Sequence, residues 1–295
     1  MKTKEEIKFP INFVKQNKEG NKAKFFSHSR LSTFEQCKLK YRFRYIDKII
    51  PEIEKTIESH LGKVVHSTLE WLYRKIKNDK IPSVDEMISY YSNAWKEEYE
   101  EGIPIIKKGL NSEHYFNKGI QFLINYYTEH KPFDDNTIDV EKEIEFVLDD
   151  SGEYKIRGFI DRLAHNPKTG EYEVHDYKTT GNFPSDEEIE NDRQLALYAI
   201  GIKEIYGKEK DVRLIWHYLS FNKKIHSKRT DEQLENLKKE TLKLVKEIEL
   251  TREFSPTKSS LCHWCEYKPI CPAWGNKIPE RQAELGRYFS ERKEF

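Results

Sequence analysis

Apolar and polar residues alternate in two short runs near the middle of the chain. The first run, residues 154–160, is separated from the second, residues 172–178, by Asn-Pro-Lys-Thr-Gly, whose Pro and Gly are typical of turns. Alternation with a period of two indicates half-buried strands, so the pattern predicts a β-hairpin. Alternation also begins near Val140, and we expect the sheet to start there.

Helical spacing of apolar residues is found on both sides of this hairpin. Ser32 followed by Glu35 matches a capping box, which predicts a helix that begins there and has Cys37 on its inward-facing stripe. A second helix is expected from about Gly62, and residues 75–132 have mostly helical patterns.

The pattern after the hairpin predicts a largely buried helix, one more strand and one long helix. The buried helix includes Leu195 to Ile200, the strand runs from Arg213 to Ser220, and the long helix covers Thr230 to Leu250. Each of these elements has a strong apolar pattern, so we expect them to pack on the sheet.

Composition narrows the class of protein without indicating a partner. Of 295 residues, 37% are hydrophobic and 35% are charged, and the 51 basic residues balance the 51 acidic ones. Global charge therefore gives no sign of nucleic acid, and any contact with DNA must come from local basic patches. The sequence has no run of 18 apolar residues, so we expect no membrane-spanning helix. The first residues do not resemble a secretory signal. We expect a cytoplasmic protein.

The hairpin contains residues that suit metal chemistry. Asp161 is expected on the first strand, and Asp176 and Lys178 on the second, where a spacing of two puts both side chains on one face. Carboxylates bind hard cations such as Mg²⁺, and a nearby lysine stabilises charge that develops on a phosphate. Charged residues mostly occupy solvated faces. The hairpin alone therefore fits two interpretations equally well, a metal site and an ordinary solvated surface.

The four cysteines form the second group of candidate ligands. Cys262, Cys265 and Cys271 are clustered near the C-terminus, whereas Cys37 lies far upstream. Four thiolates suit either a tetrahedral Zn²⁺ ion or an iron–sulfur cluster. Disulfides and unrelated buried thiols are the other interpretations, and disulfides do not fit a cytoplasmic chain.

Several motifs together resemble one known family. GFID, ending at Asp161, and DYK, residues 176–178, resemble the core of the PD-(D/E)xK nucleases, in the branch of RecB-like and AddB-like exonucleases that includes the CRISPR-associated exonucleases. The first acid follows Ile160 where the motif name has proline, and the second acid is Asp where Glu is common. GxxxHxxLE from Gly62 and QxxxY from Gln194 also resemble motifs of this branch, and they occur in its order.

The resemblance implies an α/β fold with a central mixed sheet flanked by helices. It also implies a site that holds Mg²⁺ or Mn²⁺ and in which Lys178 is catalytic. Gln194 and Tyr198 are expected to bind the DNA backbone, and Glu70 is expected to orient a neighbouring group. The implied metal ligands are His66, Asp161, Asp176 and the carbonyl of Tyr177.

For the cysteines, the same branch implies a [4Fe-4S] cluster held by Cys37, Cys262, Cys265 and Cys271. The implied function is a metal-dependent DNA exonuclease, with single-stranded ends as the expected substrate and DNA repair or recombination as the setting. Trimming of DNA for CRISPR spacer acquisition is the alternative, with an integrase or a helicase as a possible partner. A non-catalytic DNA-binding scaffold is the alternative of another class.

The expected domain organisation follows from these motifs. Residues 1–24 form an N-terminal arm, and 25–275 form the nuclease domain. Within that domain, 75–132 is a helical insertion and 262–271 is the cluster-binding segment. Residues 276–295 are a charged tail.

Overall fold

The computed structural model describes residues 23–51 and 55–278. The predicted N-terminal arm and C-terminal tail therefore lie almost wholly outside the described residues. The strands are β1 (Lys24–Phe26), β2 (Thr137–Val147), β3 (Tyr154–His165), β4 (Tyr172–Lys178), β5 (Val212–Tyr218) and β6 (Lys223–Lys228). The α-helices are α1 (His28–Gln36), α2 (Lys38–Tyr41), α3 (Ile57–Lys77), α4 (Val84–Glu98), α5 (Ser112–His130), α6 (Asp186–Glu190), α7 (Arg193–Tyr206) and α8 (Asp231–Leu250).

All six strands belong to one mixed sheet. β3 pairs antiparallel with β2 and with β4, and β5 pairs antiparallel with β6. β1 and β3 are parallel, as are β4 and β5. The predicted α/β class, mixed sheet and hairpin are therefore confirmed.

One edge of β3 is shared by two different strands. β2 pairs with β3 from Lys155 to Ala164, so β1 and β4 must both lie on the opposite edge. There β1 reaches only to Ile156, and β4 begins at Arg162. Residues 157–161 have no paired strand on this edge among the described strands, which leaves an opening roughly 17 Å long at 3.3 Å per residue.

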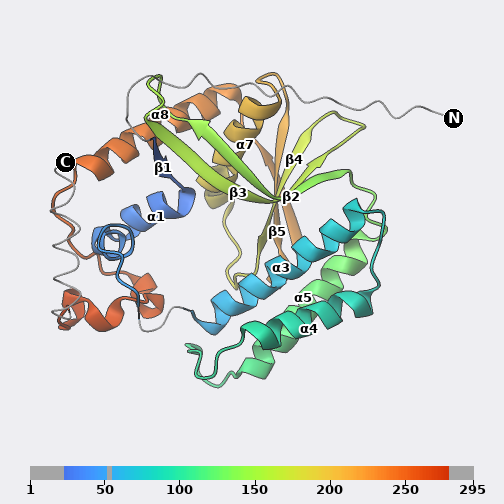
Figure 1. Cartoon of the computed structure of the whole chain (residues 1–295), viewed down its shortest axis with the longest axis horizontal. Coiled ribbons are helices and arrows are strands. Elements are labelled where there is room, and N and C mark those ends of the chain that lie inside the picture. Colours follow the sequence, from blue (N-terminus) through green and yellow to red (C-terminus); the bar gives the residue numbers. More distant parts are fainter. Residues whose placement is uncertain (1–22, 52–54, 279–295) are drawn as a thin grey trace.

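Helices cover the two faces of the sheet as separate layers. α3, α4 and α5 form one layer, and α7 and α8 lie on the other side of the sheet with α1 (Figure 1). Each layer has its own apolar core. One contains Leu61, Leu69 and Phe122 from the first layer, and the other contains Leu197 and Ile200 of α7 with strand residues. Residues 75–132, expected to be mostly helical, contain the end of α3, α4 and α5. That they form an insertion in the nuclease core stays a prediction.

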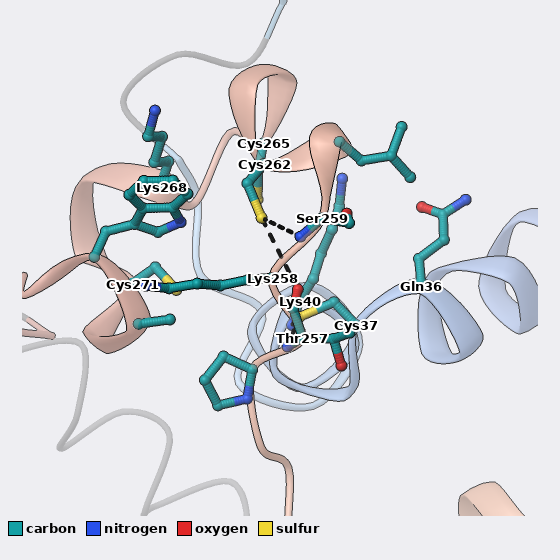
Figure 2. A pocket seen from close by; sticks show the side chains of 14 residues that line it. Gln36, Cys37, Lys40, Thr257, Lys258, Ser259, Cys262, Cys265, Lys268 and Cys271 are labelled. Atoms are coloured by element: carbon teal, nitrogen blue, oxygen red, sulfur yellow. Dashed lines mark hydrogen bonds between the residues drawn. The ribbon is translucent and has the colours of Figure 1, made fainter.

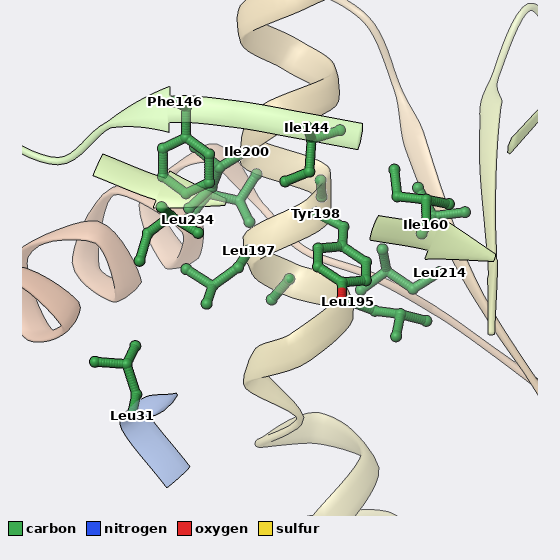
Figure 3. Packing of buried hydrophobic residues seen from close by; sticks show 14 of the residues in the cluster. Leu31, Ile144, Phe146, Ile160, Leu195, Leu197, Tyr198, Ile200, Leu214 and Leu234 are labelled. Atoms are coloured by element: carbon green, nitrogen blue, oxygen red, sulfur yellow. The ribbon is translucent and has the colours of Figure 1, made fainter. Parts of the chain in front are cut away.

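Two glycines allow α7 to pack very closely against the sheet. A Cβ added at Gly158 of β3 would lie 2.5 Å from the ring of Tyr198, and one at Gly201 would lie 2.8 Å from Ile144. Figure 3 shows Tyr198, Ile144 and Ile160 in this packed layer. Because no larger side chain fits without movement, both glycines are required for the position of α7.

The beginning of the first helix differs from the prediction. Ser27, not Ser32, caps α1, and its hydroxyl accepts a hydrogen bond from the backbone N–H of Arg30. The helix then ends at Gln36, and Cys37 has an extended backbone that caps the short helix α2. Cys37 is therefore at a break between helices and not on a continuous helical stripe.

The other helices and strands were predicted with the correct type, but one helix began earlier than expected and two strands were missed. α3 begins at Ile57, earlier than Gly62, because Thr56 and Ser59 form its capping box. β1 and β6 were not predicted. In the ranges that the structure describes, no helix is both long and apolar enough to cross a membrane.

Candidate active site and cysteine cavity

The β3–β4 hairpin brings the two predicted carboxylates to the opening in the sheet. Asp161 is the last residue of the unpaired stretch of β3, and Asp176 is near the end of β4. The backbone N–H of Tyr177 donates a hydrogen bond of 2.8 Å to Asp161 Oδ2. The two strands separate at this point, so the Asp161 carboxylate caps the backbone of β4 where a ladder partner would otherwise be.

His66 reaches the same point from α3. Its Nε2 lies 2.7 Å from the carbonyl oxygen of Tyr177, and its Nδ1 lies 3.4 Å from Asp161 Oδ2. A carbonyl oxygen can only accept, so Nε2 must be the donor. The imidazole therefore touches two of the other predicted metal ligands, although it is 111 residues away from Tyr177 in sequence.

Lys178 and two residues of α7 lie next to these carboxylates and His66. Lys178 Nζ lies 2.8 Å from Asp176 Oδ2 and donates a hydrogen bond of 2.9 Å to Gln194 Oε1. Gln194 Nε2 in turn donates to the hydroxyl of Tyr198 at 3.3 Å. The structure thus brings together His66, the hairpin residues and Gln194, and Gln194 joins Lys178 to Tyr198.

Burial and mutual charge shift the pKa values of these groups. Burial raises the pKa of Asp176 to about 6, even though the Lys178 ammonium opposes this shift. Burial alone would lower the pKa of His66, but the negative charge of Asp161 raises it to about 9. The pKa of Lys178 is also raised, because Asp176 outweighs the effect of burial. The cationic form of His66 and Lys178 is therefore favoured while no metal is bound.

The donor set fits a hard divalent cation. His66 contacts both Asp161 and the Tyr177 carbonyl. Asp176 is the residue before Tyr177, and its Oδ2 is a buried acceptor that has an ion pair but no hydrogen bond. Within residues 23–51 and 55–278, no group of three or more His, Cys, Asp or Glu is arranged so that it could hold a metal as it stands. His66 contacts Asp161 directly and Lys178 contacts Asp176, so a cation would have to replace these contacts.

Glu70 does not contact the group in the way we expected. It is half-buried on α3 and pairs with Arg74 one turn later, with 2.7 Å between Oε1 and Nη2. An orienting role for Glu70 stays a prediction.

Glu141 of β2 is a neighbour that the sequence did not single out. Its pKa is raised by burial and by the nearby charges of Asp161 and Glu70, and its φ of 49° is in the left-handed region. An acid in the alternating segment TIDVEKEIEFV gives no pattern by which it could have been found.

A buried arginine supports the backbone of Tyr177 from the opposite side. Arg162 is 1% exposed, and its Nε donates a hydrogen bond to the Tyr177 hydroxyl. Its other nitrogens contact Asp135, Thr137 and His175. A buried guanidinium needs such partners to offset its lost hydration. The side chain of Tyr177 is thus held in place, and its carbonyl and N–H face His66 and Asp161.

The four cysteines line one cavity, whose lining includes none of the residues predicted to hold Mg²⁺ or Mn²⁺. Cys37, Cys262, Cys265 and Cys271 all line it, together with Lys40, Lys268 and Trp274 (Figure 2). Apolar contacts join the two segments, because Leu39, Phe43 and Ile49 pack with Tyr267. The structure therefore places Cys37 and the C-terminal trio around one cavity, but among the described residues no three of these thiols are arranged to hold a metal.

Backbone N–H groups point at two of the sulfur atoms. The N–H groups of Lys40 and Thr257 each lie 3.5 Å from Cys37 Sγ, and that of Ser259 lies 3.4 Å from Cys262 Sγ. This hydrogen bond lowers the pKa of Cys262, whereas burial raises that of Cys265. Such donors favour the thiolate form, which is the form that binds metals.

Comparison with known proteins identifies the family. Residues 25–272 match the sequence model of the PD-(D/E)XK nuclease superfamily. The chain belongs to this nuclease superfamily. The match includes every predicted site residue, from Cys37 to Cys271. It does not distinguish the RecB-like and AddB-like branch from other branches of the superfamily.

Solved structures also resemble this nuclease at low sequence identity. SSO0001 is 15% identical, with a TM-score of 0.37, and the match covers 88% of this chain and 89% of that one. A protein from Eubacterium rectale described as a candidate exonuclease is 12% identical, with a TM-score of 0.49, and the match covers 82% of this chain and 87% of that one. No curated protein matches the chain.

Proposed function

We propose that the protein is a metal-dependent DNA exonuclease that acts on single-stranded ends in DNA repair or recombination. One observation supports the catalytic part most strongly. His66 contacts Asp161 and the Tyr177 carbonyl, and Lys178 contacts Asp176, the residue before Tyr177. Membership of the nuclease superfamily, whose members use Mg²⁺ or Mn²⁺, supports the reaction class.

The roles of the residues follow from their contacts. His66, Asp161, Asp176 and the Tyr177 carbonyl would hold Mg²⁺ or Mn²⁺, and His66 would first have to lose a proton. When bound, such an ion supplies a more acidic water molecule and neutralises charge on the scissile phosphate.

Lys178 would orient the attacking water and stabilise negative charge on the phosphate oxygens as it develops. Gln194 holds the Lys178 ammonium at 2.9 Å, so it limits the positions that the ammonium can take. DNA backbone contacts by Gln194 and Tyr198 belong to the same proposal.

Cleavage of end-labelled DNA tests this function. Single- and double-stranded substrates labelled at the 5′ or 3′ end should give products with Mg²⁺ or Mn²⁺ and none with EDTA. We expect Asp161→Ala to abolish cleavage and Lys178→Ala to lower the rate by about 100-fold or more, the usual effect of removing one group that stabilises transition-state charge.

Lys155→Ala is the matched control. Lys155 is 23% exposed against 28% for Lys178, and it pairs with Glu145 at 2.7 Å. It lies on β3 roughly 20 Å from Asp161, at six residues along the strand. Unchanged cleavage in Lys178→Ala would remove that lysine from the mechanism, and folded protein without metal-dependent cleavage would favour the non-catalytic scaffold.

We further propose that the cysteines hold a [4Fe-4S] cluster. The proposal is supported by four thiols that line one cavity and by N–H donors to two of them. Zinc is the alternative for four thiolates. Anaerobically purified protein should be brown and contain iron and acid-labile sulfide, whereas a colourless protein with one equivalent of zinc would contradict the cluster.

The setting of the reaction is also part of the proposal. In DNA repair or recombination the expected partner is a helicase, and in CRISPR spacer acquisition it is an integrase. Co-purification with one of them would distinguish the two pathways.

A further inference from the structure

The opening in the sheet forms a hollow next to the catalytic group. Phe25 and Phe26 of β1 line one side, Arg157, Gly158 and Phe159 of β3 form another, and Gln194 and Tyr198 of α7 are also part of the lining. Its volume is about 440 Å³. This is within the range of small-molecule sites, roughly 300–1,000 Å³, and a single nucleotide is a ligand of that class.

Phe159 is an unusual residue for this position. The strand alternates there, so that Gly158 and Ile160 are buried beneath α7 and Arg157 and Phe159 face outward. Phe159 is 50% exposed. The structure thus presents an exposed aromatic ring at the rim of the hollow, although exposure of so much apolar surface is unfavourable.

The hollow shares Gln194 with the catalytic group. Phe159 is two residues before Asp161, and Gln194 belongs both to the lining and to the hydrogen bond with Lys178. A molecule in the hollow would therefore be adjacent to a phosphate held at the two acids. Two residues along a strand span roughly 7 Å, so a base at Phe159 would be near a phosphate at Asp161.

The chemistry of the lining favours an unpaired base. Exposed aromatic rings stack with nucleobases whatever their sequence, and a stacked base contributes about 1–3 kcal/mol. The bases of a duplex are already paired and stacked, so they are not available to a ring at the edge of a sheet. The nearby Arg157 already has ion pairs with Glu143 and Glu145, so charge alone does not make this surface attractive to DNA.

We infer that this hollow binds the base of the nucleotide next to the scissile phosphate, with Phe159 as the stacking residue. The inference rests on the proposed nuclease function and makes it more specific, because it assigns the site and the residue that bind one base of the single strand. Phe159 has no part in the chemical step. Its effect is on the position and affinity of the strand.

Binding of single-stranded oligonucleotides that each contain one abasic residue tests the inference. Fluorescence anisotropy with EDTA present measures binding without cleavage. We expect Phe159→Ala to weaken binding of intact DNA about tenfold, which is consistent with the loss of one stacked base. Removing the base at one position should weaken binding to the unsubstituted protein similarly, and should have little further effect on Phe159→Ala.

Two variants keep this test specific. Phe159→Trp preserves a stacking ring and should restore binding. Ile205→Ala removes an apolar side chain of similar exposure, 47%, from the far end of α7 and should leave binding unchanged.

Equal sensitivity of Phe159→Ala and unsubstituted protein to every abasic position would overturn the inference. If metal-dependent cleavage is nevertheless observed, only the base-binding role fails. If the folded protein neither binds nor cleaves DNA, the proposed function fails with it.

Discussion

Single residues at the site combine burial with charge. Asp176 is the most buried of the acids, yet its partner is a lysine whose other contact is Gln194. Tyr177 contributes through its backbone, which contacts His66 and Asp161, while Arg162 holds its hydroxyl. On β4, the Asp176 side chain thus contacts Lys178, whereas Tyr177 contributes its backbone to the site and its side chain to the contact with Arg162.

His28, at the start of α1, predicts acid sensitivity. Burial, with help from the charge of Arg193, lowers the pKa of His28 to about 4. The unfolded chain, with an ordinary pKa near 6.5, binds the proton first as the pH falls, so stability decreases from about pH 6.5 downward. At pH 5 the loss through this residue is about 2 kcal/mol.

Urea unfolding at pH 7 and pH 5 measures this loss. His28→Asn should have a smaller difference between the two pH values than the unsubstituted protein. His114→Asn, at an exposed position on α5, is the control and should leave the difference as it was. An unchanged difference in His28→Asn would show that His28 is not the responsible group.

At the scale of elements, α7 is the helix on which the site most depends. It supplies Gln194 and Tyr198, and its distance from the sheet is set by Gly158 and Gly201. Any change that moves α7 outward also moves the hydrogen-bond partner of Lys178.

Gly158→Ala is expected to destabilise the fold by about 1–3 kcal/mol, the usual cost of forcing an extra methyl into a packed layer. The new Cβ would lie 2.5 Å from the Tyr198 ring, which must then move. Thermal unfolding should detect the loss, and cleavage should fall as well. Gly181→Ala is the matched control, since its nearest neighbour would be 3.8 Å away. Equal melting temperatures for the two variants would contradict this packing argument.

Sequence patterns predicted the elements that have a strong local period. The hairpin was found because its alternation is regular and its turn contains Pro and Gly. β1 was missed because three residues are too few to show a period. The helix start was placed at Ser32 because Glu35 completes a capping-box pattern, whereas the true cap, Ser27, has Arg30 at the third helical position.

The motif residues of the site could be predicted from the sequence, but the residues and the opening around them could not. Asp161, Asp176 and Lys178 were recognised from a motif, and the structure brings them together. The buried Arg162 and the exposed Phe159 reverse what their residue types suggest, because tertiary packing decides both. The opening in the sheet depends on which strands pair with β3, and periodicity contains no information on that.

At the scale of the whole molecule, the cysteine cavity joins the two ends of the described chain. Cys37 and Cys262 are 225 positions apart, from 262 minus 37, yet both line one cavity. Closing a loop of this length removes entropy from the unfolded chain, which stabilises the folded protein by about 5 kcal/mol if the cluster acts as a disulfide would.

Cys37→Ala should therefore lower thermal stability markedly in anaerobic protein if a cluster is bound. The comparison is Cys37→Ala against unsubstituted protein, each before and after removal of iron by a chelator. Iron removal should destabilise only the unsubstituted protein. Equal stability of all four samples would exclude a structural role for the cluster.

The opening between β1 and β4 has a consequence for biosynthesis. Its two sides are contributed by residues near 25 and near 176, and Gln194 follows later still. A ribosome delivers these parts in that order, so a nascent chain has both acids before it has the helix that positions Lys178. Products of translation that stop before α7 would therefore have the acidic motif without the glutamine that holds the Lys178 ammonium.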